Sequence, residues 1–138
     1  MSGKIKPLTK AQRAELKMKY GGRCAYCGVV LGDRWHADHL EAIQRKIVIA
    51  GNRLVSTNEC YRPELHCIEN LMPACPPCNI NKSVFDLETW RGYIAKHVES
   101  FNRHSAPYRI AKAYGLVIET AAPVVFYFEK IAANTEKP

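Results

Sequence analysis

Two pairs of cysteines constrain the fold of this chain more than any other feature. Cys24 and Cys27 form one Cys-x-x-Cys sequence, and Cys75 and Cys78 form another. Each such turn presents two sulfur atoms at the spacing of metal ligands, so two turns can converge on one tetrahedral Zn²⁺. Gly28, directly after the first pair, allows the tight turn that such a site needs. We therefore predict a structural zinc site that joins segments far apart in the sequence.

Other interpretations of the cysteines remain open. The two pairs can be buried thiols without metal, or a redox motif, although a redox motif needs a single reactive pair at the start of a helix. The role of Cys60 and Cys67 is ambiguous. Together with His66 they can bind a second metal, they can form a disulfide, or they can remain reduced. Reduced thiols in an ordered loop are the interpretation that we favour.

Length and charge set the remaining bounds. A chain of 138 residues is typical of one globular domain, and its net charge of +7 favours a polyanionic partner such as nucleic acid. The basic N-terminal residues are not followed by an apolar run, which argues against a secretory signal or a membrane anchor. We expect a cytoplasmic protein with no membrane partner.

The first half of the chain predicts one helix and two hairpins. Thr9 and Gln12 have capping-box spacing, and Gly21 and Gly22 can end the helix that follows them. Residues 29–39 are typical of strands, and their interruption at Gly32 and Asp33 suggests a hairpin. Residues 46–57 predict a second hairpin or an extended flap.

The second half predicts helices followed by a closing pair of strands. A helix is expected to begin at residues 79–82, and Asp86 is a suitable cap for a longer helix through about Phe101. Pro107 and Gly115 can bound a short helix. Residues 116–120 and 124–130 predict two strands, and residues 132–138 a polar tail. The members of an apolar set that recurs at helical spacing are expected to form core: Leu87, Trp90, Tyr93, Ile94, Val98 and Phe101.

Short motifs between and after the cysteine pairs carry the functional signal. Asp38 and His39 follow a predicted strand, Asn70 and Leu71 precede the second pair, and Asn79 follows Cys78. With Lys82, these residues resemble the HNH, or ββα-metal, endonuclease family over about residues 23–83. A weaker likeness to phage-associated members continues through residues 85–94. The chain departs from the family pattern by having Asn79 where a histidine is usual, and by a long loop over residues 39–70.

The resemblance implies an α+β, zinc-stabilised ββα-metal fold. The N-terminal helix would precede the core, and a helical extension over about residues 84–130, with the short strand pair, would follow it in one domain over residues 1–138. The implied activity is hydrolysis of phosphodiester bonds in DNA by a one-metal mechanism. In-line attack by water would leave 5′-phosphate and 3′-hydroxyl ends.

The residues themselves suit this chemistry. Phosphodiester hydrolysis needs a base for the attacking water and positive charge against the departing oxygen. His39 can be neutral near pH 7, and Asp38 and Asn79 offer hard oxygen ligands suited to Mg²⁺ or Mn²⁺. Neighbouring strand residues point to opposite sides, so Asp38 and His39 can serve metal and water separately.

The resemblance assigns a role to each of these residues. Asp38 and Asn79 would bind the catalytic ion, His39 would act as general base, and Asn70 would brace the loop that carries His39. From position alone, His36 can join or support the metal shell or face solvent. Lys82 can hold a DNA phosphate or be a solvated helix lysine.

Partners beyond this site are less constrained. Double-stranded DNA is the expected substrate, and a second copy of the chain or a phage protein are further candidate partners. A set of basic residues can follow a DNA backbone if its members share a face, or can be dispersed charge: Arg91, Lys96, Arg103, Arg109 and Lys112. His97 and His104 lack companion ligands, so no metal role is expected for them. The alternative function is a zinc-dependent DNA-binding or assembly module without catalysis.

Overall fold

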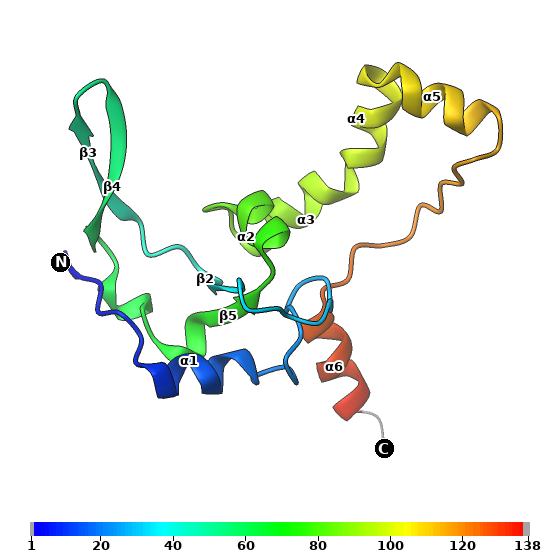
Figure 1. Ribbon diagram of the computed structural model, residues 1–138. Helices are drawn as coiled ribbons and strands as arrows, with labels where there is room; N and C mark the ends of the chain where they lie inside the picture. The colour runs from blue at the N-terminus through cyan, green and yellow to red at the C-terminus, as the bar shows by residue number, and fades with distance from the viewer. Residues whose placement is uncertain (1, 137–138) are drawn as a thin grey trace. The chain divides into compact units, whose positions relative to one another are not determined.

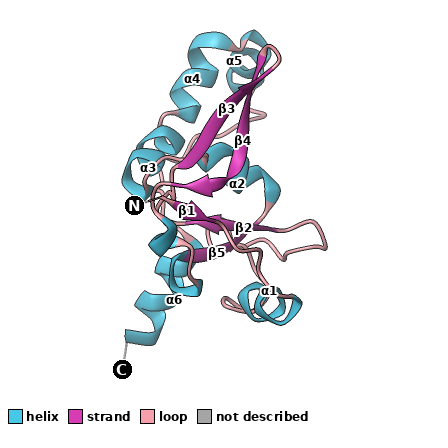
Figure 2. Cartoon of the chain, turned by 90° about the vertical axis from the view of Figure 1, so that its left-hand side faces the viewer, coloured by secondary structure: helices cyan, strands magenta, loops and turns pink. Residues whose placement is uncertain are grey.

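A short antiparallel strand pair positions both the cysteines and the candidate catalytic residues. Strand β2 (His36–His39) pairs with β5 (Leu71–Ala74), and Asp38 lies opposite Met72. The two strands lie side by side in Figure 2. All four residues of β5 are buried, so this strand forms the centre of the surrounding core.

The predicted hairpin over residues 29–39 is wrong. Strand β2 pairs with β5, more than thirty residues later in the chain, and not with the segment before it. The earlier segment bonds elsewhere: Cys24 N–H donates to the Val29 carbonyl at 2.8 Å, and Leu31 N–H donates to the Gly22 carbonyl at 2.8 Å. These bonds use backbone groups that a hairpin would have needed.

Helix α1 (Lys10–Lys17) begins with the predicted capping box. The Thr9 hydroxyl accepts from Gln12 N–H at 3.1 Å, and the Gln12 side chain accepts from Thr9 N–H at 2.9 Å. Leu16 is buried on the side that contacts β5. Beyond the helix, Lys19 Nζ donates to the Leu71 carbonyl at 2.9 Å, which further ties this region to β5.

The predicted hairpin or flap over residues 46–57 is confirmed as a hairpin. Strands β3 (Arg45–Ala50) and β4 (Arg53–Cys60) pair antiparallel, and β1 (Gly3–Lys4) adds a short strand along β4. The hairpin is conspicuous in Figure 1. Large apolar side chains are exposed along it: Ile47, Val48, Ile49, Leu54 and Val55. Two short 3-10 helices, Pro63–Leu65 and Ile68–Asn70, connect β4 to β5.

Helix α2 (Pro76–Lys82) starts directly after Cys75, three residues earlier than predicted. Proline is favoured in the first turn of a helix because its missing N–H would have no intrahelical partner there. The helix therefore includes Cys78 and Asn79, and it contacts β2.

The predicted strands over residues 116–120 and 124–130 are absent from the described chain. Residues 116–126 have no regular structure, and α6 (Tyr127–Glu136) begins where the second strand was expected. Tyr127 N–H donates to the Tyr26 carbonyl at 2.9 Å, and Phe128 N–H donates to the Ala25 carbonyl at 2.9 Å. Most of the predicted polar tail is part of this helix, and its last two residues lie outside the described range.

The computed structural model describes residues 2–136, which form two units. The first contains residues 2–86 and 126–136, and the second contains residues 87–125. The fold is mixed α and β, as predicted. Among the described helices, none has the length and apolar character needed to cross a bilayer.

The second unit consists of α3 (Leu87–Ala95), α4 (His97–His104) and α5 (Ala106–Ala113). The single helix predicted through Phe101 is interrupted at Lys96, whose N–H bonds to the Tyr93 carbonyl three residues back. The predicted core is correct only in part. Trp90 is buried and Leu87 and Ile94 are half-buried, whereas the other three members, Tyr93, Val98 and Phe101, are exposed.

Candidate functional site

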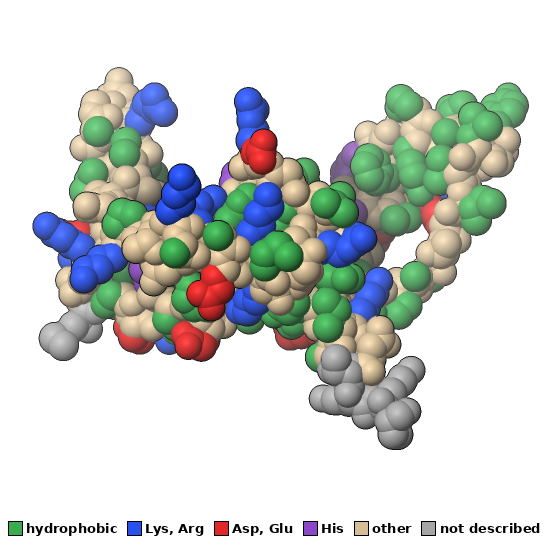
Figure 3. All heavy atoms as spheres, turned by 60° about the horizontal axis from the view of Figure 1, so that its bottom comes forward, with side chains coloured by type: hydrophobic (Ala, Val, Ile, Leu, Met, Phe, Trp, Pro, Cys, Tyr) green, Lys and Arg blue, Asp and Glu red, His purple; other side chains and the backbone are tan. Residues whose placement is uncertain are grey.

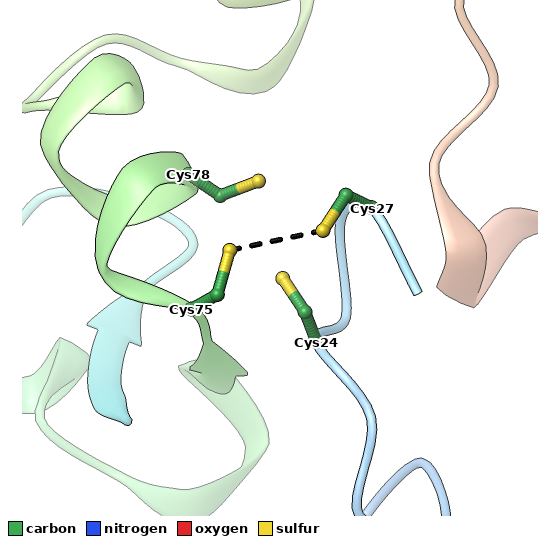
Figure 4. Close-up of side chains that lie close together, drawn as sticks. All are labelled: Cys24, Cys27, Cys75 and Cys78. Carbon is green, nitrogen blue, oxygen red and sulfur yellow. Dashed lines mark hydrogen bonds between the residues drawn. The ribbon is translucent and has the colours of Figure 1, made fainter. Parts of the chain in front are cut away.

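The four cysteines form one cluster. Their sulfur atoms all lie within 4.8 Å of one another, and those of Cys27 and Cys75 are 3.7 Å apart. Figure 4 shows the four side chains pointing toward a common centre, with Cys75 and Cys78 at the start of α2 and Cys24 and Cys27 on the loop between α1 and β2. Zn–S bonds of about 2.3 Å give tetrahedral sulfur spacings of about 3.8 Å. The cluster therefore has the size and donor set to hold a metal ion such as zinc.

Backbone hydrogen bonds build this arrangement. Gly28 N–H closes the first turn onto the Cys24 carbonyl at 3.0 Å, and Ala25 N–H crosses to the Pro73 carbonyl of β5 at 2.8 Å. Gly28 has φ of +81°, and a Cβ there would lie 3.0 Å from Tyr127 Cδ1 of α6. Glycine is thus required both for the turn and for the approach of α6.

The electrostatics of the cluster favour a bound cation. A hydrogen bond with Cys78 lowers the pKa of Cys24 to about 4, and the same contact raises the pKa of Cys78. Burial raises the pKa of Cys75 to about 11. Close sulfur atoms cannot all ionise in this environment without positive charge among them. A divalent ion at the centre would supply that charge.

Cys60 and Cys67 are free thiols and form no disulfide. Over the residues that the structure describes, the tetracysteine cluster is the one group of His, Cys, Asp or Glu side chains arranged to hold a metal. The second metal site that was considered for Cys60, His66 and Cys67 is therefore not formed. His97 and His104 likewise belong to no metal group in this part of the chain.

On the side of β2 that faces α2, Asp38 forms a buried network. Tyr26 Oη donates to Asp38 Oδ2 at 2.5 Å, and Lys82 Nζ lies 3.1 Å from the same oxygen. Burial raises the pKa of Asp38, while the Tyr26 hydrogen bond and the Lys82 charge oppose that rise. The second carboxylate oxygen of Asp38, Oδ1, has no hydrogen-bond partner among the described residues. Every fully buried polar side-chain atom among these residues has a partner, so Oδ1 is not fully buried. Oδ1 is therefore open to a ligand.

Lys82 occupies a different environment from the one that phosphate binding requires. Its side chain is 0% exposed, and Nζ donates to the His39 carbonyl at 2.9 Å in addition to contacting Asp38. A phosphate cannot reach a cation that is enclosed in this way. Lys82 instead fixes the end of β2, because its ammonium group binds both the Asp38 side chain and the backbone carbonyl of His39.

Removing the Lys82 charge should destabilise the fold. In Lys82→Met, Asp38 is left buried without its cation, and breaking such a pair typically costs about 3 to 5 kcal/mol. Urea unfolding of the metal-loaded protein would measure this change. As the matched control, Asp38→Asn should recover stability in the Lys82→Met background, because it removes the unpaired charge and keeps an acceptor for Tyr26. A single variant as stable as the wild type would contradict the importance of the pair.

His36 orients Asn79. The Nδ2 atom of Asn79 lies 2.7 Å from Nδ1 of His36, a distance that fits donation from the amide to the ring. This contact leaves the Asn79 side-chain oxygen, which has no hydrogen-bond partner within residues 2–136, available as a metal ligand. His36 thus supports the predicted ligand from β2, the supporting role that its position suggested.

His39, the last residue of β2, contacts another histidine. Its Nε2 lies 2.9 Å from Nδ1 of His66. Burial lowers the pKa of His39 to about 4. The imidazole is therefore neutral at physiological pH, as a general base must be.

Asn70 holds the loop that follows His39. Its side-chain oxygen accepts from Glu41 N–H at 3.0 Å, and its Nδ2 donates to the carbonyls of Glu41 and Leu65 at 2.9 and 2.8 Å. The Asn70 carbonyl also accepts from Leu40 N–H at 2.8 Å. Through these hydrogen bonds Asn70 connects to the loop that follows His39, the loop that the resemblance implied it would brace.

The predicted residues Asp38, His39 and Asn79 line a single open cleft of about 530 Å³. The exposed residue Arg45 lines it as well. We call this space the β2 cleft. Sequence reasoning missed Arg45, and it considered His66 only as a possible metal ligand, because neither residue belongs to a recognisable motif.

The predicted basic surface of the second unit is partly neutralised. Arg91 pairs with Glu88 at 3.0 Å, Arg103 with Glu99 at 2.9 Å, and Lys112 with Glu119 at 3.0 Å. Elsewhere on the face that Figure 3 draws, Lys and Arg side chains also lie among hydrophobic and acidic ones. These pairs favour dispersed charge over a continuous stripe.

Comparisons of this chain with protein-family models, curated proteins and solved structures find no significant match.

Proposed function

We propose that this chain is an HNH-type endonuclease that hydrolyses phosphodiester bonds in double-stranded DNA. The observation that carries the proposal is the β2 cleft, in which a carboxylate, a neutral histidine, an amide and an arginine meet. The order of elements also supports it, because the antiparallel pair β2 and β5 followed by α2 is a ββα sequence.

The residues of the cleft divide the work. The free oxygens of Asp38 and Asn79 would hold Mg²⁺ or Mn²⁺, which supplies positive charge against the departing oxygen. His39 would take the proton of the attacking water, and Arg45 would orient the phosphate. Lys82 and His36 contact the two ligands from behind and fix their orientation.

Structural zinc at the four cysteines is part of the same proposal. The cluster ties the loop of Cys24 and Cys27 to the start of α2, one turn before Asn79. Through Ala25 and Pro73, the same loop is joined to β5, the partner of the strand that carries Asp38 and His39. Zinc would thereby hold both halves of the β2 cleft in register.

We expect supercoiled plasmid to be cut in the presence of Mg²⁺ or Mn²⁺ and to remain intact after mild chelation. A site with two protein ligands leaves most coordination positions to water and substrate, so this ion should exchange readily, while four thiolates retain zinc. Gel analysis of the plasmid, with elemental analysis of zinc in the same samples, would test both statements.

Asn79→Ala serves as the control for the catalytic ion, since it removes one proposed oxygen ligand and leaves the buried pair of Asp38 and Lys82 intact. Cleavage that persists after every exchangeable metal has been removed would contradict the one-metal mechanism. Binding of DNA with no cleavage under any metal would instead favour a zinc-dependent DNA-binding or assembly module.

A further inference from the structure

His66 forms a hydrogen-bonded chain with the candidate base. Its Nδ1 lies 2.9 Å from Nε2 of His39, and its own Nε2 bonds to the Lys6 carbonyl in the segment after β1. His66 directly follows the 3-10 helix Pro63–Leu65, where its N–H donates to the Pro63 carbonyl at 3.0 Å. Both its ring and its backbone are thus held in place.

When both rings are neutral, the hydrogen bond to the Lys6 carbonyl determines which nitrogen of His66 and which nitrogen of His39 carries a proton. A carbonyl oxygen only accepts hydrogen bonds, so Nε2 of His66 must carry a proton and donate it. In a neutral His66 ring, Nδ1 then has a lone pair and accepts from Nε2 of His39. A neutral His39 that donates from Nε2 has its lone pair on Nδ1.

Nδ1 of His39 is available for chemistry. This atom has no hydrogen-bond partner within the described part of the chain. Every fully buried polar side-chain atom in that part has a partner, so Nδ1 is not fully buried. Nδ1 is therefore accessible, and His39 lines the β2 cleft together with Asp38 and Asn79. The lone pair fixed by the His66 contact belongs to the accessible nitrogen.

We propose that His66 is a positioning residue that holds His39 as the Nε2–H tautomer and so presents Nδ1 as the base. In the reaction, Nδ1 takes a proton from water, the water oxygen bonds to phosphorus, and the bond from phosphorus to the 3′ oxygen breaks. The 3′ oxygen leaves with the bonding electrons and takes a proton from solvent. His39, now an imidazolium, continues to donate from Nε2 to His66. This role rests on the proposed nuclease function, but the tautomer itself does not.

Two substitutions of His66 separate positioning from bulk. His66→Phe keeps a ring but removes both hydrogen bonds, whereas His66→Gln retains an acceptor and a donor. We expect His66→Phe to lower kcat for plasmid cleavage about 10- to 100-fold, the usual cost of losing an orienting partner, with KM nearly unchanged. His66→Gln should recover most of kcat. His104→Phe, the same change at an exposed histidine of α4, is the control and should leave kcat unaltered.

Nitrogen-15 NMR of the histidine rings tests the tautomer directly in the zinc-loaded protein. We expect His39 of the wild type to be protonated at Nε2, and His66→Phe to give a mixture of both tautomers. Protonation at Nδ1 in the wild type, or an unchanged tautomer and kcat in His66→Phe, would overturn the proposal. A wild type with the expected tautomer that cuts no DNA would refute the nuclease function and leave the arrangement of the two rings standing.

Discussion

Cys75→Ser should remove the zinc and unfold the first unit, which is the largest stability effect that the structure predicts. The sulfur atom of Cys75 lies 3.7 Å from that of Cys27, and serine cannot replace it as a zinc ligand of comparable strength. Structural zinc contributes about 10 to 16 kcal/mol of binding free energy in zinc-finger peptides, whereas whole domains are stable by about 5 to 15 kcal/mol. Loss of the ion is therefore sufficient to unfold this unit.

Elemental analysis and thermal unfolding would measure the effect. Wild-type protein should carry about one zinc per chain, and Cys75→Ser should carry little. Cys67→Ser is the matched control, because Cys67 is a free thiol outside the cluster and should be dispensable for zinc binding. Full zinc occupancy in Cys75→Ser would show that the ligands have been misidentified.

His39→Ala should abolish most cleavage without disturbing the fold. Loss of a general base typically costs about 10² to 10⁴ in rate. Zinc content and DNA affinity should be almost unchanged, because the His39 side chain contacts neither the cysteines nor the buried Asp38 pair. Single-turnover kinetics on plasmid, with a separate binding assay, would distinguish lost chemistry from lost affinity. An alanine variant that cleaves at the wild-type rate would exclude His39 as the base.

The pH dependence of cleavage offers an independent check on His39. Only the neutral ring can accept a proton, so the rate must fall as the pH drops through the pKa of His39. Burial and nearby positive charge lower that pKa to about 4, compared with an ordinary value of about 6.5. The rate should therefore persist through pH 6 and decline only as the pH approaches about 4. A midpoint near 6.5 would indicate that His39 is more exposed during catalysis.

The features that were predicted correctly depend on short stretches of sequence. The capping box of Thr9 and Gln12 spans one helical turn, and the two Cys-x-x-Cys turns specify their own geometry. The hairpin of β3 and β4 joins neighbouring strands through a tight turn at Gly51. Local residue patterns are sufficient for such elements, since few distant contacts compete with them.

The errors arise where distant contacts decide the outcome. Residues 124–130 have the β-branched and aromatic composition of a strand, but backbone contacts to Ala25 and Tyr26 hold the start of α6 there instead. Because Lys82 lies one turn after Asn79, it was a candidate phosphate ligand or a solvated lysine. It is buried instead, because it pairs with Asp38, which also accepts a hydrogen bond from Tyr26. His66 was considered only as a possible metal ligand with Cys60 and Cys67, because its contacts with His39 and Lys6 depend on how the loop folds back.

The β3–β4 hairpin lies between the two cysteine pairs, whose nearest sulfur atoms belong to residues 48 positions apart. A metal ion at the cluster closes this whole segment into a ring. The entropic cost of closing a flexible ring rises only logarithmically with its length, by about 0.6 kcal/mol for each doubling. The β3–β4 hairpin, which borders the β2 cleft, can therefore lengthen or shorten with little change in the folding free energy of the rest of the protein. Such an architecture lets the surface beside the β2 cleft vary while the scaffold around the four cysteines stays constant.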